Sequence, residues 1–285
     1  MKAVGLIKGS PVRYVLMLLG GCLVFFSQVK IDLMLKTERQ GELMYFPNAA
    51  VTKAAAFGYD NLAGDWIWLQ TIQYYGQHTL TDRQYKYLGH MFDVLIVLAP
   101  NFRVAYNFGA LLLAHDAADV PAADRLMKKG MENNPEDWSI PFFRGFVHYV
   151  FARNYREAGR WFTISSRQLN APEMPGRFAA FAMQKGKDLE TSRALWVELM
   201  NKTENKTEKS IAQYYINKID RGNILQQLQG AAGNFQKDNN RTIASLKDLV
   251  LWGYIKRIPD DPLGGYFYWD SDKKTVMAEG GQSIK

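Results

Sequence analysis

Residues 101–172 read NFRVAYNFGALLLAHDAADVPAADRLMKKGMENNPEDWSIPFFRGFVHYVFARNYREAGRWFTISSRQLNAP and contain two copies of one pattern. In the second half of each copy, three residues recur at a spacing of four positions and then three. The two sets are Ala123, Met127, Gly130 and Ala158, Phe162, Ser165. An upstream set, Leu88, Phe92, Leu95, has the same steps. A proline closes each unit, at position 100, 135 or 172.

This spacing is typical of paired α-helices. Steps of three and four residues keep side chains on one helical face. Gly76, Gly109 and Gly145, in the first halves, are expected at helix crossings, where a glycine permits close approach. The prolines are expected to end the second helices. Since one hairpin cannot bury its apolar face alone, the sequence predicts an all-α solenoid of stacked helix pairs over residues 60–236.

The pattern resembles the tetratricopeptide repeat family. Phe108-Gly109, Ala123-x3-Met127 and Pro135 match it best; Gly145, Ala158-x3-Phe162 and Pro172 follow, and Gly76, Leu88-x3-Phe92 and Pro100 match least. The resemblance implies a non-enzymatic protein-binding scaffold, whose concave face is lined by the first helix of each pair.

Other signals extend the helical prediction. Thr81-x-x-Gln84 is interpreted as a capping box that opens the helix carrying Tyr85 to Leu98. Residues 177–185 and 191–200 predict a further helix pair, broken at residues 186–188. Ser210 to Leu228 is predicted to be a long amphipathic helix that covers the end of the stack.

The N-terminal segment from Tyr14 to Val29 has no charged residue, and Lys2, Lys8 and Arg13 precede it. It predicts a single-pass anchor at 14–33, a cytoplasmic tail at 1–13 and a linker at 34–59. A cleaved signal peptide and a lipoprotein signal at Cys22 are the alternatives. All three interpretations place the bulk of the chain outside the cytoplasmic membrane of a bacterium.

The C-terminal tail, residues 237–285, differs in character. It predicts a short helix opened by Ser245-x-x-Asp248, then a hairpin of the aromatic run at 266–269 and a return strand at 274–277. The segment LKDLVLWGYIKRIPDDPLGGYFYWD is similar to the C-terminal motif of type II secretion major pseudopilins. That resemblance implies a pilus or secretion assembly as partner; a hairpin that only caps the repeats is the alternative.

Composition bears on the class of protein. The net charge is +7, but without a dense basic block it does not favour nucleic-acid binding. The single cysteine and four scattered histidines do not favour a metal site. Since no catalytic or cofactor motif occurs, we expect a protein that is not an enzyme and has no cofactor.

The predicted function is therefore a scaffold for other proteins, in a secretion, pilus or envelope assembly. An envelope enzyme or enzyme subunit is the alternative from another class, and a structural stabiliser of a membrane complex is the third. Polar residues on the first-helix faces form the candidate binding surface. They are Asp65, Gln70, Gln73, Asn107, Arg144 and His148.

Overall fold

The computed structural model describes residues 18–27, 29–30 and 47–283, and the chain divides into two compact units, Met1–Pro47 and Asn48–Lys285. In the first unit, residues 18–27 and 29–30 are helical and exposed. Across the described ranges, no helix combines the length and apolar character that a bilayer crossing requires. The predicted tail at 1–13 lies outside the described residues, and the predicted anchor at 14–33 lies only partly within them.

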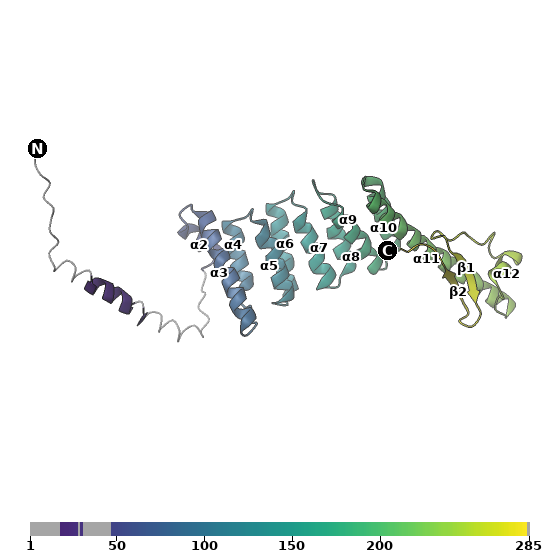
Figure 1. The fold of residues 1–285 in the computed structure, drawn as a ribbon, viewed down its shortest axis with the longest axis horizontal. Helices are drawn as coiled ribbons and strands as arrows, with labels where there is room; N and C mark the ends of the chain where they lie inside the picture. Colours follow the sequence, from purple (N-terminus) through teal and green to yellow (C-terminus); the bar gives the residue numbers. More distant parts are fainter. Residues whose placement is uncertain (1–17, 28, 31–46, 284–285) are drawn as a thin grey trace, which may run out of the picture. The chain divides into compact units, whose positions relative to one another are not determined.

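The second unit is mostly helical, and its helices contact one another in sequence order (Figure 1). Four consecutive pairs make up most of it. They are α3 (Asp60–Leu80) with α4 (Leu88–Leu98), α5 (Arg103–His115) with α6 (Val120–Asn133), α7 (Ser139–Val150) with α8 (Tyr155–Ser166), and α9 (Met174–Lys185) with α10 (Leu189–Lys202). The prediction of a repeat-like helical array is thus confirmed.

The second helix of every pair buries one row of side chains. Each row follows the predicted steps of four and three residues. The rows are Leu88, Phe92, Leu95 in α4; Ala123, Met127, Gly130 in α6; Ala158, Phe162, Ser165 in α8; and Ser192, Trp196, Leu199 in α10. The fourth row extends the pattern past Pro172, so the packing rule is shared by all four pairs.

Two of the three predicted crossing glycines lie where helices touch. A Cβ atom added at Gly109 would come within 2.8 Å of Leu126 and Phe92, and one at Gly145 within 2.7 Å of Phe162. The prediction for Gly76 is wrong, because a Cβ atom there would meet nothing within 4 Å. Gly76 lies on the side of α3 opposite the buried residues Ile67, Thr71 and Tyr74, so it does not face α4.

The capping box predicted at Thr81-x-x-Gln84 is also wrong. α3 continues to Leu80, so Thr81 is its C-cap, and the Thr81 hydroxyl donates to the carbonyl of Gln77 at 2.8 Å. α4 begins only at Leu88. Residues 81–87, which were predicted to open the second helix, therefore form the connection between α3 and α4.

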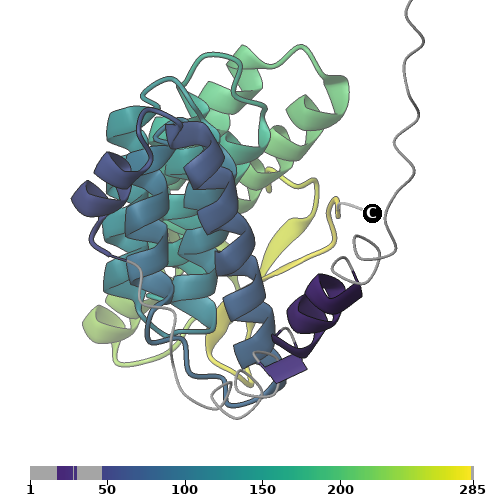
Figure 2. The same cartoon turned by 90° about the vertical axis from the view of Figure 1, so that its left-hand side faces the viewer.

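The array begins with α2 (Ala49–Ala55), which packs against α4 and lies in the range predicted as a linker. Its first turn is capped by Asn48, whose side chain accepts a hydrogen bond from the amide of Val51 at 3.0 Å. Figure 2 views the array from the α2 and α3 end. No helix pair precedes α3 in the described part of the chain, so the outer face of α3 ends the array.

α11 (Lys206–Asn239) has 34 residues, longer than the helix predicted at 210–228, and it runs through the domain boundary predicted after residue 236. Its first half contributes Ala212, Ile216 and Ile219 to the core of the third and fourth pairs. Its second half contributes Leu228, Ala232 and Phe235 to a separate core shared with the tail. One helix therefore belongs to two hydrophobic cores.

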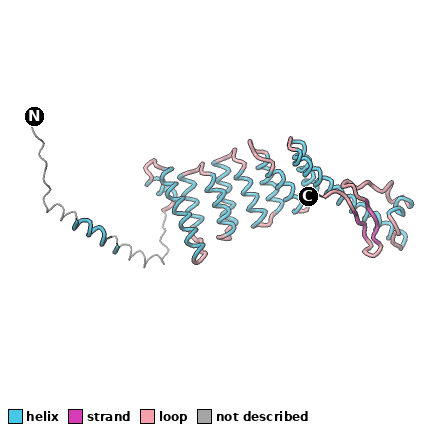
Figure 3. The backbone as a smooth tube through the Cα atoms, viewed as in Figure 1, coloured by secondary structure: helices cyan, strands magenta, loops and turns pink. Residues whose placement is uncertain are grey.

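The tail contains α12 (Leu246–Leu251) and an antiparallel hairpin of β1 (Tyr266–Asp270) and β2 (Thr275–Glu279), as predicted (Figure 3). Phe267 and Val276 enter the core with α11. The Asp261 carboxylate, with no exposed side-chain surface, pairs with Arg221 of α11 at 2.9 Å. It also accepts from the amides of Leu263 and Gly265 at 3.0 and 3.1 Å. The tail is therefore packed onto α11 by both apolar and charged contacts.

Candidate protein-binding surface

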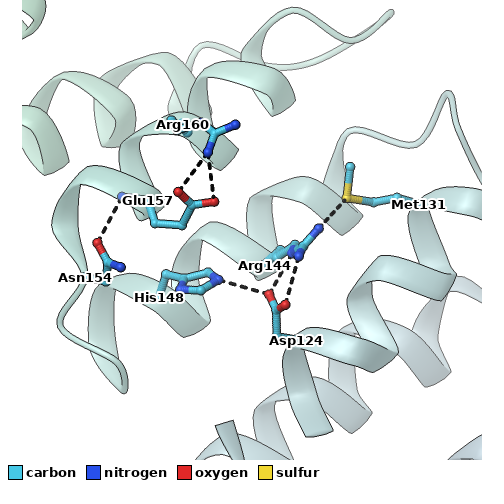
Figure 4. A network of polar contacts seen from close by, with 7 residues as sticks. All are labelled: Asp124, Met131, Arg144, His148, Asn154, Glu157 and Arg160. Atoms are coloured by element: carbon cyan, nitrogen blue, oxygen red, sulfur yellow. Dashed lines mark hydrogen bonds and ion pairs between the residues drawn. The ribbon is translucent and has the colours of Figure 1, made fainter. Parts of the chain in front are cut away.

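Two of the predicted site residues, Arg144 and His148, converge on one carboxylate (Figure 4). Arg144 donates from Nε and Nη2 to the two oxygens of Asp124, at 2.7 and 2.8 Å. Nε2 of His148 lies 3.0 Å from Oδ1 of the same carboxylate. The Arg144 guanidinium also stacks on the ring of Trp161, 3.8 Å from its centroid. These four residues, the Asp124 cluster, join α6 to α7 and α8.

The electrostatics of the Asp124 cluster favour the charged carboxylate. Burial by itself would raise the pKa of Asp124, but hydrogen bonds and positive charge from His148 and Arg144 outweigh it and hold the pKa well below its ordinary value of 3.8. A bidentate arginine pair is also geometrically specific. The cluster therefore fixes how the third helix pair sits on the second, and it uses the charge of Arg144 within the chain.

Another face of α7 is apolar and reaches solvent. Phe143, Phe146 and Val150 follow at steps of three and four, so they share one side of the helix. Val150 is 41% exposed, while Phe143 and Phe146 are partly buried. Their rings lie 6.5 Å apart, and Phe146 contacts Phe151 at 6.4 Å. We call these three residues the α7 apolar stripe.

Polar groups lie near both ends of the α7 apolar stripe. At the start of α7, Asn107 of α5 donates from Nδ2 to the hydroxyl of Ser139 at 2.9 Å, while Asn107 Oδ1 is buried and has no partner. At the other end, the exposed ring of His115 contacts Phe151 at 5.8 Å. An apolar centre with polar groups at its borders is the usual composition of a protein-binding surface.

The remaining predicted residues lie on α3, away from these groups. Asp65 and Gln73 are exposed, and Gln70 is half-buried. Of the two tryptophans in this helix, Trp68 packs edge-on against Phe102 and Phe108, at 5.2 and 5.9 Å. The structure thus brings Arg144 and His148 together but leaves Asp65, Gln70 and Gln73 on a separate surface.

The outer face of α3 carries large exposed apolar side chains. Their exposed fractions run from 56% for Trp66 to 87% for Leu80. With Gln73 and Gly76 they form one row in alternating steps of three and four residues, the α3 apolar stripe. It consists of Tyr59, Leu62, Trp66, Leu69, Gln73, Gly76 and Leu80.

A cavity of about 190 Å³ lies where the loop after α8 meets the loop after α10. Its polar groups bond to each other: the Thr203 hydroxyl donates to the Glu173 carboxylate, and Lys202 donates to the carbonyl of Ser166 at 3.0 Å. Among the described residues, no three His, Cys, Asp or Glu side chains gather as metal ligands. The cavity therefore offers contacts between elements rather than a group aimed at a ligand.

Sequence reasoning missed Asp124 and the α7 apolar stripe. Asp124 lies in the first half of α6, where carboxylates are common, and nothing in its neighbourhood marks it as the partner of residues in another pair. The steps between Phe143, Phe146 and Val150 were readable, but aromatic residues at helical spacing more often form the core. No protein-family model, curated protein or solved structure matches the chain.

Proposed function

We propose that this chain is a tetratricopeptide-type scaffold that binds other proteins and catalyses no reaction. The observation that carries the proposal is that the second helix of all four pairs buries a row of side chains spaced four and then three residues apart. These rows run from Leu88 in α4 to Leu199 in α10. Helix pairs stacked by one rule build an extended surface from their first helices, and such surfaces are used to bind proteins.

The α7 apolar stripe is the part of that surface that we assign to a partner. Aromatic side chains supply much of the binding energy at protein interfaces, above all when less important polar contacts surround them. Phe143 and Phe146 are held by ring contacts on the core, so little side-chain freedom remains to be lost on binding. Asn107, Ser139 and His115 provide the polar border.

We further propose that the chain is anchored in the cytoplasmic membrane of a bacterium, with its bulk outside. This part rests on the sequence from Tyr14 to Val29 and the basic residues before it. A pilus, secretion or envelope assembly is proposed as the partner because the tail sequence is similar to the pseudopilin motif. Both parts need tests separate from the test of the binding surface.

Photo-cross-linking tests the binding surface. A photoreactive amino acid is introduced at Val150 in the full chain, in cells of the organism that encodes it. Lys128, which is exposed on α6, serves as the control position. We expect a discrete adduct with a pilus, secretion or envelope component from position 150 alone, and its loss in the Phe146→Ala variant. Equal adducts from both positions, or none, would contradict the proposal.

Thiol labelling tests the location. Cys22 is replaced by serine, and Leu169, an exposed residue between α8 and α9, by cysteine. We expect a membrane-impermeant maleimide to label Leu169→Cys in intact spheroplasts as fully as after lysis. Labelling only after lysis would place the bulk of the chain in the cytoplasm and would leave the binding proposal standing.

A further inference from the structure

We infer that the α3 apolar stripe is the contact between two copies of this chain, which pair antiparallel through α3. The large apolar side chains of the stripe are each more than half exposed. Ile67, Thr71 and Tyr74 are the buried side of α3, and Trp68 and Tyr75 contact α5 through Phe108. Because successive residues of a helix are turned by about 100°, the stripe points away from both the buried side of α3 and the side that contacts α5.

The spacing of the stripe fits a second helix. Alternating steps of three and four residues are the repeat by which two helices pack along their length. The stripe runs through all 21 residues of α3, a length of about 31 Å. Scattered surface apolar residues need no explanation, but five large apolar side chains that share one helix face, each more than half exposed, are typical of an interaction site.

The sizes of the side chains fit a copy of α3 in the antiparallel direction. Gly76 leaves a gap in the stripe, since a Cβ atom there would meet no atom within 4 Å. Antiparallel pairing about a two-fold axis near residue 71 places Trp66 of each copy over Gly76 of the other. It also sets Leu62 against Leu80, and Leu69 against Gln73. Because the axis is two-fold, each of these contacts occurs twice.

The charges favour the same direction. α3 contains Asp60 and Asp65 in its first half and no lysine or arginine at all. Parallel pairing would place each carboxylate beside its equivalent, where like charges repel. Antiparallel pairing places Asp65 near Thr79 of the other copy instead. It also places the positive N-terminal end of each helix dipole beside the negative C-terminal end of the other. Size and charge thus select one partner and one direction.

Disulfide formation in the full chain tests the direction. In a Cys22→Ser background, chains with Leu62→Cys and chains with Leu80→Cys are expressed separately and together. We expect oxidation to link the two chains when they are co-expressed and to link neither one to itself. Self-linking of Leu62→Cys would show a parallel pair, and no linking in any sample would show that the copies do not meet here; either result overturns the inference.

Sedimentation of the purified full chain in detergent tests the packing. Leu69→Lys should weaken dimerisation at least about tenfold in Kd, whereas Leu169→Lys, an exposed leucine outside the stripe, should leave Kd unchanged. Gly76→Leu should also weaken it at least about tenfold, because the added side chain fills the space of Trp66. A wild-type monomer at every concentration, or a Gly76→Leu variant that dimerises as well as the wild type, would overturn the inference.

Discussion

At the residue scale, the Asp124 cluster shows how one carboxylate can set the contact between two helix pairs. Arg144 and His148 lie one turn apart on α7, and both reach Asp124 on α6. Removing the carboxylate would leave the guanidinium on Trp161 without its counter-ion in a largely buried place. Such a loss is more destabilising than the loss of an exposed ion pair.

Asp124→Asn should lower the free energy of unfolding at neutral pH by about 1.5–3 kcal/mol, the range for hydrogen bonds to charged groups. Asp93→Asn is the matched control, because the Asp93–Lys129 pair also bridges two second helices at 2.8 Å but both side chains are half exposed. That change should have an effect of about 1 kcal/mol or less. Urea unfolding measures both, and equal effects would show that burial does not matter here.

The wild-type protein and the Asp124→Asn variant should differ in how their stability responds to acid. The pKa of Asp124 is lowered in the folded chain, so its contribution to stability is complete above the ordinary value of 3.8 and is lost as the pH falls toward the lowered value. The stability difference between wild type and Asp124→Asn should therefore shrink as the pH drops below about 4. A difference that grows in acid would contradict this assignment.

Single residues were also where prediction from sequence was weakest. Gly76 and Gly109 give the same signal, yet only Gly109 lies at a crossing, because Gly76 is on the outer side of α3. Arg144 and His148 were selected for their helical face, but their partner Asp124 is on another helix pair, and spacing along the chain does not encode that meeting. Whether these residues bind a partner remains a prediction.

At the scale of elements, glycines in different helices should respond oppositely to the same substitution. Gly109→Ala forces a methyl group to within 2.8 Å of Leu126 and Phe92, and overpacking of this kind costs about 1–3 kcal/mol. Gly230 is exposed within α11, with nothing within 4 Å, so Gly230→Ala should stabilise by about 0.5–1 kcal/mol. Thermal unfolding of the two variants checks both signs, and a stabilised Gly109→Ala would refute the crossing.

The existence of most helices was predictable, and their ends were not. The steps of four and three residues located α4, α6 and α8 because burial imposes that period. α11 was predicted too short because the residues after Leu228 are largely polar or small. Ala232 and Phe235 keep the chain helical there by packing on the tail, a contact that no local pattern records.

At the scale of the whole molecule, the two cores should be separable by mutation. Phe235 is buried only in the core shared by α11 and the tail, so Phe235→Ala should destabilise that region by about 3–5 kcal/mol. Hydrogen exchange should accelerate across residues 243–279 and stay unchanged in α7 to α10. Trp196→Ala, in the other core, is the matched control and should give the reverse. Uniform acceleration by either variant would show one cooperative unit.

The continuity of α11 has a mechanical consequence. Its backbone hydrogen bonds run without interruption from the residues that close the array to those that hold the hairpin. A pull applied at the hairpin therefore travels along a stiff rod about 51 Å long, and not through a loose joint. A partner bound to the hairpin would therefore transmit force along α11 directly to the last helix pair.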